Sequence, residues 1–183
     1  FLDTDDDFWN KREKKFQELL NEHKSDNYYD CIVPVSGGKD SYYQTHIICK
    51  KYNLKPLLIT YDANNWLPEG EYNRKRLKNN FDIDHIMWSP SVEVLKKINR
   101  LAFNKIGDMN WNDHCGIFTV PIIMAVRFKI PLIIWGETSW DVAGIYGPED
   151  FVEFSNRNRH ENSLRGYEWY DFINDKENKL REK

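Results

Sequence analysis

Short apolar runs alternate with amphipathic stretches along most of this chain, and this alternation limits the possible folds more than any other feature of the sequence. Four apolar runs predict strands, at residues 31–35, 56–61, 84–88 and 131–135. Apolar residues at helical spacing predict helices over residues 4–24, 42–52, 69–80, 91–105 and 114–128. Strands separated by helices form parallel sheets through right-handed crossovers. We therefore predict an α/β fold: a Rossmann-like parallel sheet with helices on both faces.

Two prolines fall inside these predicted elements. Pro34 lies in the first strand, where its missing N–H removes one ladder hydrogen bond and predicts a local irregularity. Pro121 lies in the last helix, which it should either kink or begin.

The composition of the chain fits a folded protein and narrows its partners. Of the 183 residues, 15% are aromatic, which argues against disorder, and no apolar run approaches the roughly 18 residues of a membrane-spanning helix. The net charge of −3 makes nucleic acid an unexpected partner. The cysteines Cys31, Cys49 and Cys115 are odd in number and form no C-x-x-C pair, so we expect neither a disulfide framework nor a self-contained zinc site. A cytoplasmic location is predicted.

The segment after the first predicted strand carries the residue types of an anion-binding loop. It consists of Ser36, Gly37, Gly38, Lys39, Asp40 and Ser41. The glycines let the backbone approach an anion closely, and the helix that follows offers unpaired N–H groups and the positive end of its dipole. The serine hydroxyls and the lysine add hydrogen bonds and positive charge. The aspartate would repel a phosphate unless a cation lay between them, so the loop predicts a phosphate ligand with Mg²⁺.

A second polar segment follows the fourth predicted strand. It contains Gly136, Glu137, Ser139 and Asp141. Because ligands of parallel sheets bind beyond the carboxyl ends of the strands, this segment should lie near the loop. We expect Glu137 and Asp141 to complete the Mg²⁺ site with Asp40, and Gly136 and Ser139 to contact the phosphate ligand. The same segment could instead cap the N-terminus of a helix.

The six-residue loop, in its strand–loop–helix setting, resembles the PP-loop of the ATP pyrophosphatase superfamily. That superfamily has an adenine nucleotide alpha hydrolase-like fold and includes asparagine, GMP and NAD synthetases. The resemblance implies that ATP is bound and cleaved between its α and β phosphates, with Lys39 and Asp40 as catalytic residues. It also implies that residues 60–65, at the second strand end, hold the adenine and ribose. Asp62 is the predicted ribose contact, unless it merely ends the strand.

Three further stretches resemble the N-acetyl sugar amidotransferase family of this superfamily. They are residues 112–121 (NDHCGIFTVP), 136–147 (GETSWDVAGIYG) and 153–167 (EFSNRNRHENSLRGY). The resemblance implies that ATP adenylates the acetamido oxygen of an N-acetyl sugar and that ammonia then displaces AMP to give an acetamidino sugar. It implies a place in lipopolysaccharide, O-antigen or flagellar glycan biosynthesis of the pseudaminic or legionaminic type. Ammonia would come from a glutaminase partner resembling the subunits of imidazole glycerol phosphate synthase.

Members of that family extend further at both ends and typically carry a cysteine-rich segment before the first helix. The resemblance therefore implies that this chain is a piece of a longer protein. Within residues 1–183 we expect a single PP-loop ATP pyrophosphatase domain. It should comprise an N-terminal helix within residues 1–25, a nucleotide-binding core over 30–145 and a polar C-terminal segment over 146–183.

Contacts to the sugar are predicted in the last of the matching stretches. A dense polar patch there contains Arg157, Arg159, His160 and Arg165. Arginine forks suit phosphate or carboxylate groups, so a nucleotide-linked or acidic sugar would fit. The alternative is a solvated loop or a subunit interface. By contrast, the basic run at residues 74–78 is predicted to be a solvated helix face.

Two other functions stay open on the sequence alone. The chain could be another adenylating enzyme of the superfamily, such as a tRNA thiolase, or an ATP-binding module without catalysis. The acidic net charge and the missing cysteine pair argue against a thiolase. We expect Cys115 to be a small buried residue rather than a sulfur carrier or a metal ligand.

Overall fold

The computed structural model of this protein describes residues 5–24, 27–63, 66–136, 156 and 159–172. Its longer elements are α1 (Asp6–Glu22), β1 (Cys31–Pro34), α2 (Lys39–His46), β2 (Pro56–Tyr61), α3 (Pro68–Phe81), β3 (His85–Trp88), α4 (Val92–Ile106) and α5 (Trp111–Phe128). Three short helical segments accompany them: η1 (Ile47–Lys51), η2 (Arg159–Ser163) and η3 (Trp169–Phe172). Strands and helices alternate, as the sequence predicts.

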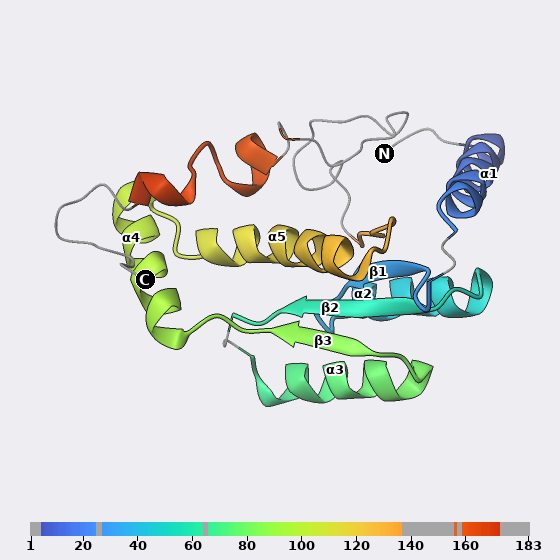
Figure 1. Ribbon diagram of the computed structural model, residues 1–183, viewed down its shortest axis with the longest axis horizontal. Coiled ribbons are helices and arrows are strands. Elements are labelled where there is room, and N and C mark those ends of the chain that lie inside the picture. Colours follow the sequence, from blue (N-terminus) through green and yellow to red (C-terminus); the bar gives the residue numbers. More distant parts are fainter. Residues whose placement is uncertain (1–4, 25–26, 64–65, 137–155, 157–158, 173–183) are drawn as a thin grey trace.

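The sheet has the order β1-β2-β3, and both strand pairs are parallel (Figure 1). The predicted strand at residues 131–135 lies on the free side of β1 but makes an isolated parallel bridge, Ile32 to Ile133, rather than a full strand. Two hydrogen bonds form this bridge: the Ile32 N–H donates to the Leu132 carbonyl and the Ile134 N–H to the Ile32 carbonyl, each at 2.9 Å. β1 therefore lies between β2 and the 131–135 segment. Strands β2 and β3 follow on one side of β1, and the later 131–135 segment lies on its other side. The order of strands reverses at β1, which makes this point the switch point of the sheet.

Pro34 explains why the fourth strand stays short. The next hydrogen bond of this parallel ladder would run from the N–H of residue 34 to the carbonyl of Ile134, and proline has no N–H to donate. The side chain of Gln44 takes its place, because its Nε2 donates to that same carbonyl at 2.6 Å. The irregularity predicted at Pro34 thus falls on the edge that faces residues 131–135.

Helices cover both faces of the sheet, so the predicted fold class is confirmed. In Figure 1 α5 runs along one face and α3 along the opposite face. On the α5 side a buried cluster joins Ile32, Leu57, Ile59, Tyr61, Val120 and Ile130. On the other side a second cluster joins Cys31, Val33, Val35, Ile48, Leu58 and Leu77. Alternate residues of β1 and β2 thus enter opposite clusters, as strand geometry requires.

Several helix boundaries differ from the predicted ones. α1 begins at Asp6 because Asp5 caps it, with the Asp5 carboxylate accepting the Phe8 N–H at 2.9 Å. α5 begins at Trp111 and runs unbroken through Pro121, which is buried inside it and is not its start. The described part of the C-terminal segment packs on α4 and α5 through a third cluster of Ala102, Trp111, Leu164 and Phe172. No helix in the described ranges combines the length and the apolar character that crossing a bilayer requires.

Candidate nucleotide-binding site

The predicted anion-binding loop joins β1 to α2 at the switch point of the sheet. Gly37 has a φ of +82°, in the left-handed region that favours glycine. A Cβ at Gly37 would also lie 2.7 Å from the Cγ of Arg74 on α3, so the backbone of the loop packs directly on that side chain. Glycine is therefore required here for conformation and for space.

Hydrogen bonds between the two loop serines fix the curvature of this loop. The Ser36 N–H donates to the Ser41 Oγ at 3.0 Å, and the two hydroxyl oxygens lie 3.1 Å apart. α2 starts immediately after Gly38, which caps the helix with no side-chain hydrogen bond. The first N–H groups of α2 are left without a side-chain cap, and this is the arrangement that binds anions at helix N-termini.

Lys39 and Asp40 form an ion pair at the mouth of the loop. Their Nζ and Oδ1 atoms lie 2.7 Å apart, and the side chains are 88% and 74% exposed. An ion pair this exposed contributes little to stability. Lys39 and Asp40 can therefore separate at small cost, and each can then contact a ligand. Asp40 lines the cavity described next.

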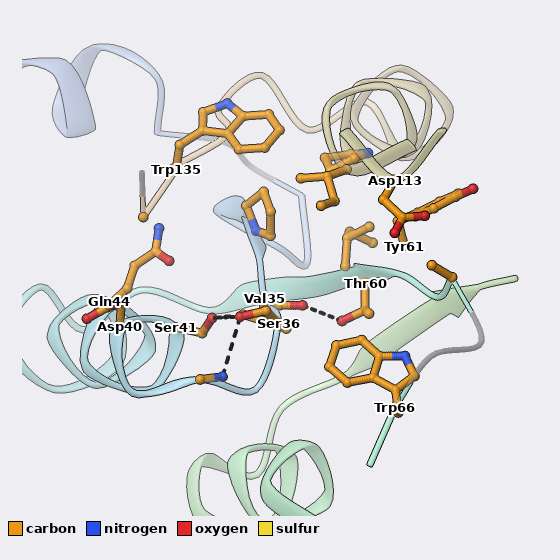
Figure 2. Close-up of a pocket in the computed structure, with 17 residues that line it drawn as sticks. Val35, Ser36, Asp40, Ser41, Gln44, Thr60, Tyr61, Trp66, Asp113 and Trp135 are labelled. Carbon is orange, nitrogen blue, oxygen red and sulfur yellow. Dashed lines mark hydrogen bonds between the residues drawn. The ribbon is translucent and has the colours of Figure 1, made fainter. Parts of the chain in front are cut away.

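A cavity of about 230 Å³ lies beside the loop, which is room for an organic group rather than for a single water. Its polar and aromatic lining consists of Ser36, Asp40, Ser41, Gln44, Thr60, Tyr61, Trp66, Asp113 and Trp135. The lining residues come from several parts of the chain, among them β1, β2, α2, α5 and the end of the 131–135 segment (Figure 2). The structure thus brings the loop, the second strand end and Gly136 together around one cavity, as the sequence argument expects for the carboxyl edge of the sheet.

Trp66 forms one wall of the cavity and is held in place from its edge. Its indole Nε1 donates to Asp62 Oδ1 at 2.7 Å, and Ser89 Oγ donates to Asp62 Oδ2 at 2.8 Å. Asp62 does not itself line the cavity. In this structure it positions the tryptophan, and its predicted contact to a ribose stays a prediction.

Tyr61 and Asp113 form a further wall, where β2 meets α5. Asn112 Nδ2 donates to the Tyr61 hydroxyl at 2.8 Å, and burial raises the pKa of Tyr61 to about 12. Burial also raises the pKa of the Asp113 carboxyl. Gly116 makes this wall possible, because a Cβ there would overlap the Tyr61 ring. Asp113 was not predicted as a site residue, although it is the second residue of the 112–121 stretch that resembles the sugar amidotransferases.

Thr60 and His85 form a hydrogen-bonded pair under the cavity floor. Thr60 Oγ1 donates to the Val35 carbonyl at 2.6 Å and lies 2.8 Å from His85 Nε2. Because the threonine proton points to Val35, we assign the proton of this contact to His85 Nε2. Burial, with the positive charges of Arg74 and Lys78, lowers the pKa of His85 to about 4, so the ring is neutral.

Gln44 and Gly136 close the cavity on the side of the fourth strand. A Cβ on Gly136 would lie 2.6 Å from Gln44 Oε1, so glycine leaves space for this amide. While Gln44 Nε2 caps the Ile134 carbonyl, Oε1 is buried and has no hydrogen-bond partner in the described part of the chain. The amide oxygen is therefore an unused hydrogen-bond acceptor of a residue that lines the cavity.

The predicted sugar-binding patch is not brought to this cavity. Arg159 pairs with Glu168, and Arg165 Nη1 lies 3.3 Å from Asp108 Oδ2. His160 Nδ1 lies 3.7 Å from the same Glu168. Arg157 lies outside the described residues, as do Glu137, Ser139 and Asp141. The assigned roles of all these residues stay predictions.

Cys115 lies next to this C-terminal segment and not in the cavity. Its Sγ approaches the Ser163 carbonyl at 3.9 Å, and burial raises its pKa to about 12. A thiol held protonated in this way is a poor nucleophile and a poor metal ligand, which fits the predicted packing role.

The carboxylates of the site fit a magnesium ion shared with a nucleotide. Among the described residues no three or more His, Cys, Asp or Glu side chains gather as a metal site of their own. Mg²⁺ in nucleotide sites is instead held by one or two carboxylates together with phosphate oxygens and water. Asp40, at the loop, meets that requirement, and Asp113 is a second carboxylate on the cavity wall.

The fold and the loop together define an α/β protein with a glycine-containing strand–loop–helix unit at the switch point of its sheet. Solved structures that share this fold include the following two. The NH3-dependent NAD synthetase from Campylobacter jejuni subsp. jejuni NCTC 11168, in complex with the nitrate ion, matches with a TM-score of 0.57 and 11% identity, over 86% of this chain and 76% of that one. The NMN synthetase from Francisella tularensis matches with a TM-score of 0.52 and 13% identity, over 70% of this chain and 56% of that one.

These likenesses confirm the fold and nothing finer. NAD synthetases are among the members of the superfamily that the loop resembles. The chain spans little more than half the length of the NMN synthetase. No protein-family model matches the sequence, and no curated protein does either.

Proposed function

We propose that this chain is the ATP-binding, adenylating part of an ATP-dependent amidotransferase. The observation that carries the proposal is the position of the Ser36–Ser41 loop, which closes a cavity at the switch point of the sheet with the first N–H groups of α2 uncapped. The pyrophosphate part of ATP would bind at this loop. The adenosine part would occupy the cavity beyond it.

Each loop residue has a distinct part in this proposal. The backbone N–H groups and the Ser36 hydroxyl would bind phosphate oxygens. Lys39 would leave Asp40 and stabilise the negative charge that develops on the leaving pyrophosphate. Asp40 would hold Mg²⁺, which supplies charge neutralisation of the phosphates when it is bound.

The proposed reaction has two steps. The acetamido oxygen of an N-acetyl sugar attacks the α-phosphorus of ATP, and the bond to the β-phosphate oxygen breaks with release of pyrophosphate. Ammonia then adds to the activated carbon, loses a proton and expels AMP, which leaves an acetamidino sugar. The adenylate is needed because the amide oxygen is otherwise a poor leaving group.

The choice of ammonia and of a sugar rests on different support. A protein of the same fold is an NH3-dependent synthetase, which supports ammonia as the nucleophile. The sugar, the lipopolysaccharide or flagellar glycan pathway and a glutaminase partner rest on the resemblance of residues 112–121, 136–147 and 153–167 to the sugar amidotransferases. We propose a cytoplasmic location with them, since nucleotide-linked sugars and ATP are made there.

Product analysis tests this function. The chain is mixed with Mg·ATP, ¹⁵N-ammonium and a panel of N-acetylated nucleotide sugars, and phosphorus NMR follows the nucleotide. We expect AMP and pyrophosphate in the presence of one sugar, with ¹⁵N in the sugar product by mass spectrometry. ADP and phosphate would contradict the PP-loop assignment. ATP binding without turnover, even with a glutaminase and the full panel, would favour a non-catalytic ATP-binding module.

A further inference from the structure

Arg74 is a buried cation without a counter-ion. It belongs to the basic run that the sequence predicts to be a solvated helix face, and for this residue the prediction is wrong, because Arg74 is only 5% exposed. No carboxylate in the described part of the chain lies within ion-pairing distance of it. Its Nη1 donates to the weak acceptor Met87 Sδ at 3.5 Å, and its buried Nε has no hydrogen-bond partner among the residues that the structure describes.

An arrangement of this kind destabilises the free protein. A buried guanidinium without a counter-ion carries a desolvation cost, which a contact with an aromatic ring offsets only in part. The charge of Arg74 already acts on its surroundings, since it helps to lower the pKa of the nearby His85. An anion bound close by would supply the missing compensation.

The two contacts of Arg74 show where that anion would bind. Its stem packs against Gly37 of the loop, where a Cβ would lie 2.7 Å from the arginine Cγ. Its guanidinium carbon lies 3.9 Å from the centroid of the Trp66 ring, and Trp66 lines the cavity. Arg74 therefore contacts both the loop, at Gly37, and Trp66 of the cavity wall.

Other residues restrict how Trp66 can respond. Asp62 holds the indole nitrogen, and a Cβ on Gly70, one turn before Arg74 on α3, would lie 3.1 Å from the ring. Trp66 thus contacts the guanidinium of Arg74 and also lines the cavity. Loss of the Arg74 stem would therefore disturb the loop and this wall together, whereas loss of the charge alone would leave both packed.

We propose that Arg74 is a positioning residue of the nucleotide site. Its side chain fixes the loop at Gly37 and Trp66 in the cavity wall, and its charge, which no carboxylate of the described residues balances, attracts the phosphates of the ligand. This inference rests on the proposed function as far as the ligand is a nucleotide. It goes beyond that function because the charge should favour phosphate groups over the nucleoside part.

Binding of three probes to the whole chain tests the inference: Mg·ATP, pyrophosphate and adenosine, each by calorimetry. Arg74→Met keeps the stem and removes the charge. We expect it to weaken binding of ATP and of pyrophosphate on the order of tenfold and to change adenosine binding by less than about twofold. Arg74→Lys, which keeps a charge, should recover most of the pyrophosphate affinity. Arg76→Met, an exposed position on the same helix, serves as the matched control and should bind all three probes as the wild type does.

The Tm of the ligand-free proteins distinguishes this role from a purely structural one, because loss of a purely structural residue would lower the Tm. Because the methionine keeps the packing of the stem and removes a buried charge that has no counter-ion, the Tm of Arg74→Met should equal or exceed that of the wild type. A much lower Tm, or a variant that does not fold, would show that the charge is already compensated and would overturn the inference, as would unchanged pyrophosphate affinity. Wild-type protein that binds neither ATP nor pyrophosphate would contradict the proposed function as well, whereas tight ATP binding that is indifferent to Arg74→Met would contradict this inference alone.

Discussion

Asp40 belongs to the loop and also lines the cavity, and its ion pair with Lys39 is exposed and easily broken. We predict that Asp40→Asn abolishes the advantage that Mg²⁺ gives to ATP binding, because the variant loses the carboxylate that would share the ion with the phosphates. AMP formation should fall by roughly 100-fold or more. Calorimetry with ATP in Mg²⁺ and in EDTA measures the first effect, and phosphorus NMR measures the second.

Lys75→Ala is the control for Asp40→Asn. Lys75 is exposed on α3 beside the buried Arg74, so its removal tests whether any charge change near the loop has the same effect. We expect binding and turnover to stay at the wild-type level. If Asp40→Asn retained its full dependence on Mg²⁺, Asp40 would have no place in the metal site.

His85 predicts a pH dependence of stability whose sign follows from burial. Its pKa falls from 6.5 to about 4 in the folded protein, so between these values the unfolded chain binds a proton that the folded chain does not. The free energy of unfolding is therefore highest, as far as His85 is concerned, above the unfolded pKa of 6.5. It decreases as the pH falls from 6.5 toward 4, because protons then bind the unfolded chain preferentially. From the shift of 6.5 − 4 = 2.5, the upper limit of this decrease is about 3 kcal/mol.

His85→Gln tests this dependence. A glutamine Nε2 can still donate to Thr60 Oγ1 but does not titrate, so urea unfolding should show the variant losing less stability than the wild type between pH 7 and pH 4. The exposed His46 provides a comparison, and His46→Gln should follow the wild-type curve. Parallel curves for wild type and His85→Gln would mean that the imidazole is not held neutral.

At the scale of elements, the contact between α5 and β2 depends on one glycine. Gly116 is buried on α5, and a Cβ there would overlap the ring of Tyr61, a wall of the cavity. We predict that Gly116→Ala lowers the free energy of unfolding by about 2 kcal/mol, because displacement of the ring outweighs the gain of about 1 kcal/mol in helix propensity. Thr119→Ala, exposed on the same helix, should change it by less than about 0.5 kcal/mol. A stabilised Gly116→Ala would show that Tyr61 moves without cost.

The order of elements was predictable because it depends on local periodicity. The three paired strands fall where the apolar runs predict them, and the loop lies where its glycines and serines place it. The fourth strand shortens to a bridge for a reason that needs three dimensions: the hydrogen bond that Pro34 cannot make is supplied by Gln44, a neighbour only in the fold. The same holds for α5, whose start at Trp111 reflects packing of that ring against Leu164 and Phe172.

The cavity wall was less predictable than the loop. Trp66 and Gln44 belong to no motif, and Asp113 lies in a resembling stretch that gives it no role. All three become site residues only because three separate segments meet at one edge of the sheet. The burial of Arg74 was not predicted, since a run of basic residues does not indicate which of them points into the protein. Its spacing of three from the buried Leu77 on α3 is the signal that could have found it.

Across the whole molecule, burial is distributed unevenly, and this predicts an order of local unfolding. All six residues of β2 are buried, whereas Leu20 is the buried residue of the much longer α1. α1 is attached through Phe16, whose ring centroid lies 5.2 Å from that of Tyr52, and through Glu13, which accepts the Tyr52 hydroxyl proton at 2.8 Å. Elements with few buried contacts open at lower free energy than the core.

We therefore predict that amide hydrogens of α1 exchange well before those of β2 in hydrogen–deuterium exchange followed by mass spectrometry. Tyr52→Phe removes the hydroxyl that holds Glu13, and the loss of a hydrogen bond of about 1 kcal/mol should accelerate exchange in α1 by about fivefold. Tyr72→Phe, at an exposed tyrosine on α3, should leave α1 unchanged. Equal exchange rates in α1 and β2 would show instead that the N-terminal helix and the sheet unfold as one cooperative unit.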